Sequence, residues 1–179
     1  MRAVPTWPRR LFTLALLARD SAAADGEQQV LLGLKKRGFG VGKWNGFGGK
    51  VEATDASIVA AAAREVLEEA KVHVRSEDFE SCGVLLFSFE EREEVKEVHV
   101  FWTHRFSGEP SESEEMKPQW YDVSQIPFGS MWADDKIWLP HVLSGKIVQG
   151  HFHFAANEDF MLDYELEVST RQVTGTEAL

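Results

Sequence analysis

The sequence is poor in cysteine, in basic residues and in long apolar runs, and each shortage excludes a class of protein. Its 179 residues include a single cysteine, Cys82, so no disulfide can form within the chain. Nineteen Lys and Arg face 29 Asp and Glu, for a net charge of −10, whereas proteins that bind polymeric nucleic acid carry a basic surface. The early apolar run at 11–18 is too short to cross a bilayer.

These shortages predict the compartment of the protein and the kinds of partner that it binds. We expect a protein of the cytoplasm, with the mitochondrion or the nucleus as minor alternatives, and with neither polymeric nucleic acid nor a membrane as partner. A small anionic substrate stays compatible with the negative net charge, because a metal ion can neutralise phosphates locally.

Hydrophobic periodicity predicts one domain in which strands precede and follow a central helix. With 44% apolar residues the chain can bury one core, and we expect a single domain at 9–168 between flexible tails at 1–8 and 169–179. Residues 57–70 predict a helix with Ser57 near its N-cap, and 134–143 predict a second helix. Strands are expected at 11–17, 30–34, 84–89, 95–106, 120–123, 151–154 and 160–166, with a glycine-rich loop at 35–50. This order predicts an α+β fold, a mixed sheet with helices packed on it.

The central helix carries three glutamates on one face. Glu65, Glu68 and Glu69 stand at i, i+3 and i+4, and like charges at that spacing repel. An isolated cluster of this kind is usually a solvated acidic surface. Here the glycine-rich loop precedes the helix, and its backbone can approach a metal ion or a phosphate closely. Carboxylate oxygens are the ligands of Mg²⁺, and one glutamate could serve as general base. Arg64 is placed to order Glu68 at i+4.

A second constellation follows the late loop, where Trp132 is followed by Asp134 and Asp135. Purines stack on aromatic rings, and two neighbouring carboxylates raise each other's pKa, so one can stay protonated and donate a hydrogen bond. The alternative interpretation is a helix start, with Asp134 as N-cap and Trp132 as core. The basic run Lys35-Lys36-Arg37 has two open interpretations as well, a phosphate contact or a solvated turn.

Taken together, loop and helix resemble the Nudix box, G-x5-E-x7-R-E-U-x-E-E-x-G-U with U aliphatic. Gly49 begins the match, Arg64 to Glu69 form its centre and Val72 ends it. The wider chain resembles the oxidised-purine nucleoside triphosphatases, the animal MutT homologues, from about residue 11 to 166. The stretches that carry this likeness are 11–14, 31–50, 98–101, 112–116, 125–128, 131–135 and 162–164.

The resemblance implies a Nudix fold, with a mixed central sheet flanked by two main helices in an α-β-α sandwich. It implies Mg²⁺, with Mn²⁺ as a substitute, a purine nucleoside triphosphate as substrate, and a monomer. The resemblance implies that catalysis depends on Glu65, Glu68, Glu69 and Arg64, and that the metal is bound by Gly48, Glu65, Glu68, Glu69 and Glu115. It implies that the base is hydrogen-bonded by Asn45, Asp134 and Asp135 and stacks between Trp132 and Phe87. The pocket would also be lined by Thr13, Lys35 and Phe39.

Two departures from the Nudix box are visible. One extra residue separates Gly49 from Arg64, and the first glutamate is missing, with Asp55 at the right distance from Gly49 and Ala56 at the right distance from Arg64. Lys71 replaces the late glycine, so we expect the tight turn after the helix to be lost. These changes predict altered efficiency more than lost activity.

The expected reaction is Mg²⁺-dependent hydrolysis of oxidised purine nucleoside triphosphates, such as 8-oxo-dGTP and 2-hydroxy-dATP, to the monophosphate and pyrophosphate. A Nudix pyrophosphatase of capped RNA or of a dinucleoside polyphosphate is one alternative. A nucleotide sensor with weakened catalysis is another, and it would be marked by loss of the three helix glutamates, all of which are present.

Overall fold

The computed structural model describes residues 4–22 and 26–171 and shows strands around one long helix and one short helix. The strands are β1 (Arg9–Asp20), β2 (Gln28–Lys35), β3 (Trp44–Asn45), β4 (Glu80–Phe89), β5 (Val95–Thr103), β6 (Met116–Asp122), β7 (Lys146–Phe154) and β8 (Met161–Thr170). The helices are α1 (Ile58–Ala70) and α2 (Asp135–Leu143), with short 3₁₀ turns at Ser76–Asp78, Val123–Gln125 and Phe128–Ser130.

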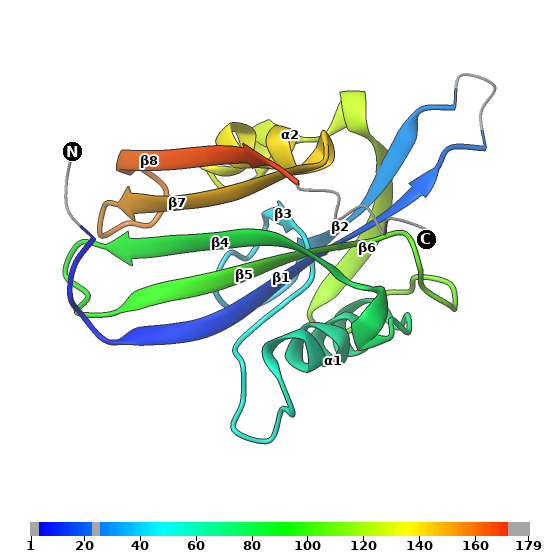
Figure 1. The fold of residues 1–179 in the computed structure, drawn as a ribbon, viewed down its shortest axis with the longest axis horizontal. Helices are drawn as coiled ribbons and strands as arrows, with labels where there is room; N and C mark the ends of the chain where they lie inside the picture. Colours follow the sequence, from blue (N-terminus) through cyan, green and yellow to red (C-terminus); the bar gives the residue numbers. More distant parts are fainter. Residues whose placement is uncertain (1–3, 23–25, 172–179) are drawn as a thin grey trace, which may run out of the picture.

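All the strands join one mixed sheet in the order β3-β2-β1-β5-β4-β7-β8, with β6 paired to β2. The β1–β5 and β4–β7 pairs are parallel and the other pairs are antiparallel. Alternate residues of β1 point to opposite faces, so Ala15 and Leu17 pack with α1 while Leu16 and Ala18 pack with α2. The two helices therefore cover opposite faces of the sheet (Figure 1), which confirms the predicted fold class.

Helix α1 forms where the periodicity predicts it. The Ser57 hydroxyl accepts a hydrogen bond from the Ala60 amide at 3.1 Å and so caps the first turn. Ala62, Val66 and Ala70 are fully buried along one stripe. That stripe fixes the rotation of the helix against β1 and thereby decides which way its acidic side faces.

The helix ends at Lys71 in a left-handed turn, which corrects the expectation that the turn is lost with the glycine. Lys71 has φ 62° and ψ 23°, and its amide donates to the carbonyl of Leu67 at 3.1 Å. The chain must reverse here because Val72, the next residue, is fully buried beneath α1. A lysine pays for this conformation with a steric penalty of about 1 kcal/mol that glycine avoids.

Replacing Lys71 by glycine is therefore expected to raise the free energy of unfolding by about 1 kcal/mol. Urea denaturation measures the change. Lys71→Ala is the matched control, since alanine removes the same side chain but keeps the strain, and it should give no gain. A stability unchanged in Lys71→Gly would show that the lysine is not strained.

Most strand boundaries differ from the sequence-based prediction, and the differences at β3, β6 and β8 have structural reasons. The glycine-rich loop contains strand β3, and β6 begins at Met116 instead of Trp120 although Pro118 lies within it. Proline is tolerated because β6 pairs with β2 alone, which leaves one side without a ladder. Strand β8 continues to Thr170, beyond the predicted domain end at 168, because its last residues pair with the start of β7. The rest of the predicted tails, 1–3 and 172–179, lies outside the described residues.

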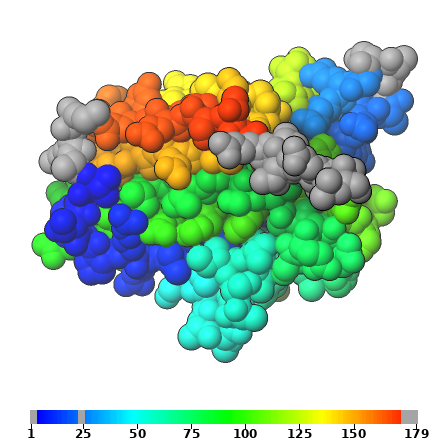
Figure 2. Space-filling view, in the orientation of Figure 1, coloured from blue at the N-terminus to red at the C-terminus, as the bar shows by residue number. Residues whose placement is uncertain are grey.

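Within the described part of the chain, neither helix is long and apolar enough to span a membrane. The loop from β3 to α1 projects from the surface below the sheet, where it appears in cyan in Figure 2. This loop leads from the glycines into the acidic helix, and its anchoring therefore bears directly on the site.

Candidate active site

A cavity of about 250 Å³ lies between the sheet, the β2–β3 loop and α2. All eight residues predicted to bind substrate line it, namely Thr13, Lys35, Phe39, Asn45, Phe87, Trp132, Asp134 and Asp135. Of the residues predicted at the metal, Gly48 and Glu69 line it too. The cavity thus extends from the acidic side of α1 to the aromatic and carboxylate residues before α2.

Two glycines bring the loop into contact with β1 and α1. A Cβ on Gly48 would lie 1.9 Å from the Thr13 carbonyl oxygen, and one on Gly49 would lie 2.5 Å from Oε1 of Glu65. The Gly48 amide donates to Oε2 of Glu69 at 3.0 Å. At Gly48 the clash is with the backbone of β1, so only glycine fits, whereas a side chain at Gly49 would displace the carboxylate of Glu65.

The acidic face of α1 is partly withdrawn from solvent. Glu69 is 3% exposed, and burial raises its pKa to about 7, opposed by the charge of Lys35. Burial also raises the pKa of Glu65, although Arg64 hydrogen-bonds that carboxylate. The charge of Glu115 adds to the rise at both groups, so its carboxylate lies close to theirs. Glu68 is more exposed.

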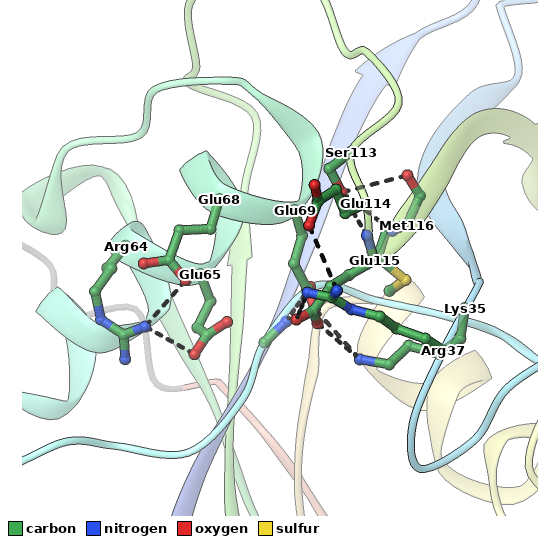
Figure 3. Close-up of polar contacts among 11 residues, drawn as sticks. Lys35, Arg37, Arg64, Glu65, Glu68, Glu69, Ser113, Glu114, Glu115 and Met116 are labelled. Carbon is green, nitrogen blue, oxygen red and sulfur yellow. Dashed lines mark hydrogen bonds and ion pairs between the residues drawn. The ribbon is translucent and has the colours of Figure 1, made fainter.

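Basic side chains from the end of β2 and the loop that follows it pair with Glu69 and Glu115 (Figure 3). Lys35 lies 3.7 Å from Glu69 and 3.2 Å from Glu115, and Arg37 lies 3.1 Å from Glu115. These two cations lower the pKa of Glu115, with Arg37 the larger cause. Lys36 pairs with Glu112 at 2.8 Å. The basic run therefore holds the loop to the acidic segment before β6, and only its first member lines the cavity.

Arg64 joins the projecting loop to the helix. Its guanidinium makes two hydrogen bonds to Asp55, at 2.8 and 2.9 Å, and lowers the pKa of that aspartate to about 2. It also bonds Glu65 at 2.9 Å and, as predicted, Glu68 at 3.3 Å across one turn. Its fifth contact is the carbonyl of Lys50 at 3.1 Å. Asp55, which stands at the distance from Gly49 that the box gives its first glutamate, is thus the main partner of Arg64.

The donor set suits a hard divalent cation, because it offers carboxylate oxygens whose burial is costly without a compensating positive charge. Among the described residues no three acidic, histidine or cysteine side chains are already grouped around one point, since Arg64 and Lys35 hold the carboxylates apart.

At the opposite end of the cavity, two buried carboxylates precede α2. Asp134 and Asp135 are each 3% exposed. Burial raises the pKa of Asp134 to about 6, and burial together with the charge of Asp134 raises the pKa of Asp135 well above its usual value. Oδ2 of Asp134 accepts from the indole of Trp138 at 2.8 Å, and Oδ2 of Asp135 accepts from the Trp132 amide at 3.0 Å. Asp134 stands at the N-cap position of α2, and Trp132 packs against the core, as the helix-start interpretation expects, but the Asp134 side chain makes no cap hydrogen bond.

Aromatic rings form the walls between the two ends. Trp132 stacks on Phe39, with ring centroids 4.9 Å apart and planes 23° apart. Phe87 stacks on Phe152 at 5.6 Å. Both Trp132 and Phe87 border the cavity, as a purine sandwich requires, but Phe39 is the ring that covers Trp132 in this arrangement.

Sequence reasoning missed several cavity residues. Phe89, in the strand predicted at 84–89, also lines the cavity, and Lys96 and Phe154 come from strands for which no cavity residues were predicted. Trp138 follows Asp134 by four residues on α2, a helical spacing that would have indicated their contact. No local signal singles out Lys96, because only the pairing of β5 with β4 turns it toward the cavity.

Comparison with known proteins identifies the family to which this chain belongs. The NUDIX domain model matches residues 16–142, so the chain belongs to the Nudix family and is a Nudix hydrolase. Hydrolases of this family act on nucleotides and need a divalent metal.

Two vertebrate proteins and one bacterial structure are similar to this chain over most of its length. The chain is 45% identical to an oxidized purine nucleoside triphosphate hydrolase of Danio rerio, over 88% of this chain and 97% of the relative. It is 44% identical to the protein of the same description from Mus musculus, over 88% and 94%. The crystal structure of a MutT protein from Bacillus halodurans superposes with a TM-score of 0.73 at 27% identity, covering 88% and 97% of the two chains.

Proposed function

We propose that this Nudix hydrolase cleaves oxidised purine nucleoside triphosphates, 8-oxo-dGTP and 2-hydroxy-dATP among them, to the monophosphate and pyrophosphate. The observation that carries the proposal is the buried pair of Asp134 and Asp135 in an aromatic cavity that also reaches Glu69. A carboxyl that can be protonated near neutral pH offers both a donor and an acceptor, so the pair can match the altered edges of oxidised purines. The names of the two vertebrate relatives support the same substrate.

We propose Mg²⁺ as the metal, with Mn²⁺ as a substitute, held by Glu65, Glu68, Glu69 and Glu115 and by the carbonyl of Gly48. The chemistry that such an ion supplies is polarisation of a phosphoryl oxygen and a lower pKa for the attacking water. One of these glutamates can also serve as general base. The Gly48 amide holds the carboxylate of Glu69 at the edge of the cavity.

Binding of the base is assigned to the rest of the cavity. Trp132 and Phe87 supply the stacking surfaces, and stacking on an aromatic ring contributes about 1–3 kcal/mol per base. Asn45, Asp134 and Asp135 supply hydrogen bonds to the edge of the ring system. Thr13, Lys35 and Phe39 line the cavity. The hydroxyl of Thr13 is buried with no hydrogen-bond partner among the described residues, so it is available to a ligand.

Pyrophosphate release with Mg²⁺ tests this function, measured for 8-oxo-dGTP, 2-hydroxy-dATP, dGTP, dATP, a capped RNA and a dinucleoside polyphosphate. We expect the highest kcat/KM on the two oxidised purines. Activity only on the cap or the dinucleotide would keep the acidic helix and remove the base assignment. Tight nucleotide binding without hydrolysis of any substrate would identify a sensor and attribute the loss to the altered box.

A further inference from the structure

The aromatic part of the cavity contains a lysine that the proposed chemistry does not use. Lys96 lies on β5 directly across from Phe87 on β4, and it lines the cavity. Its Nζ lies 3.5 Å from the ring centroid of Phe39, and 5.3 and 5.5 Å from those of Phe12 and Phe89. The ammonium is therefore enclosed by ring faces.

Unlike the other lysines of the cavity, Lys96 has no anionic partner. Lys35 pairs with Glu69 and Glu115, and Lys43 pairs with Asp159 at 2.9 Å. In residues 4–22 and 26–171 no ion pair or hydrogen bond engages the ammonium of Lys96. Glu94, whose charge acts on it, is itself paired with Arg10 at 2.7 Å.

This arrangement leaves a charged donor that a ligand can satisfy. Burial lowers the pKa of Lys96 to about 8, so the group is still mostly protonated at pH 7. Cation–π contacts compensate part of the desolvation, but an ammonium has three N–H donors, and ring faces are weak acceptors for them. A ligand oxygen reaching this point would gain a charge-assisted hydrogen bond in a poorly solvated place.

The part of the nucleotide that reaches Lys96 is the base. The phosphates belong at the other end, with Glu69, Gly48 and Lys35. Phe39, which contacts the Lys96 ammonium, stacks on Trp132, the proposed platform for the purine. On a purine edge a carbonyl oxygen is a good acceptor for an ammonium, whereas a C–H or an amino group offers nothing to it.

We propose that Lys96 is a specificity-determining residue that donates a hydrogen bond to a carbonyl oxygen on the purine ring, and so favours oxo-purines. The inference rests on the proposed function, because it assumes a purine in this cavity. The carbonyl can come from the purine's C6 or from oxidation at C8, and the experiment separates these two sources.

Lys96→Met tests the proposal, since methionine fills a similar volume without charge or donors. Calorimetry without added metal measures binding of dAMP, dGMP, 8-oxo-dAMP and 8-oxo-dGMP to the wild-type protein and the variant. The affinity for ligands that carry the recognised carbonyl should fall about tenfold or more, while that for dAMP, which has none, should stay within about twofold. If Lys96→Met loses affinity for 8-oxo-dAMP and 8-oxo-dGMP, the contact is with the carbonyl at C8. If it loses affinity for dGMP and 8-oxo-dGMP, the contact is with the carbonyl at C6.

Lys117→Met is the control, because it removes a lysine charge from an exposed position on β6 that does not line the cavity. This variant should not change the ratio of affinities for oxo- and non-oxo-purines. An equal loss on all four ligands in Lys96→Met, or the same pattern in Lys117→Met, would overturn the proposal. Comparing ratios within one variant removes any effect of partial unfolding. Failure of the proposed function would appear separately, as absent hydrolysis of oxidised triphosphates by the wild-type protein.

Discussion

Replacing Glu69 by glutamine is expected to lower kcat by about 100- to 10,000-fold, the range that a positioned general base contributes. Its carboxylate is the most buried of the acidic face and the only one of the three helix glutamates that lines the cavity. Glutamine keeps an oxygen for the Gly48 amide, so the loop should stay in place. Steady-state kinetics on 8-oxo-dGTP measures the loss, and binding of 8-oxo-dGMP should change little.

Two further variants, one in the proposed metal site and one outside it, test whether the loss of activity is specific to the metal site. Glu68→Gln is also expected to abolish hydrolysis while leaving the fold and nucleotide binding nearly intact, because Glu68 is the third proposed metal ligand on α1. Glu114→Gln is the control, since this exposed acid contacts Arg37 alone, at 3.4 Å, and should leave kcat within about twofold. Unchanged turnover in Glu69→Gln or in Glu68→Gln would remove that residue from the metal site.

Replacing Asp134 by asparagine is expected to lower the preference for oxidised over ordinary purines by about 10- to 100-fold, with a smaller effect on phosphate chemistry. Asparagine can still accept from the Trp138 indole, but it fixes one donor and one acceptor where the carboxyl can change its protonation. The preference is measured as the ratio of kcat/KM for 8-oxo-dGTP and dGTP. An equal rate loss on every nucleotide would count against a base-reading role.

The same variant should also be more stable than the wild-type protein at alkaline pH. Because the pKa of Asp134 is raised to about 6 on folding, the folded state binds more protons between about pH 4 and pH 6. Stability therefore falls as pH rises through this window, by about 2–3 kcal/mol in total. Asparagine avoids that loss, so its Tm advantage should be present at pH 8 and absent at pH 4. An advantage that does not vary with pH would argue against a buried, ionisable Asp134.

Most elements of the fold can be predicted from signals within short segments of the sequence. The helix over Ile58–Ala70 follows from apolar residues at helical spacing and a serine cap, both of which act within a few residues of each other. Strands β1, β2 and β5 follow from apolar runs. The short β3 inside the glycine-rich loop was missed, because its pairing with Gly33 and Leu34 outweighs the turn tendency of the surrounding glycines.

The residues of the site likewise fall into those that local spacing predicts and those that only the tertiary structure brings together. Glu65, Glu68 and Glu69 share a helix face that spacing alone predicts, and the resemblance supplied the eight residues that meet in the cavity. Lys96 and Phe89 reach it through the register of β4 against β5 and β7, which no short segment encodes. The raised pKa of Asp134 was expected from its acidic neighbour, yet its largest cause is burial, which depends on the whole tertiary structure.

The bidentate contact of Arg64 with Asp55 has a consequence for how changes in the projecting loop reach the acidic helix. Arg64 joins Asp55 and the carbonyl of Lys50 in the loop to Glu65 and Glu68 on α1, so a substitution at Asp55 also alters the setting of these glutamates. Substitutions at Asp55 and at Arg64 remove the same contact, and their effects on stability should therefore not add. A change in this loop can thus affect the acidic face from a position that does not line the cavity.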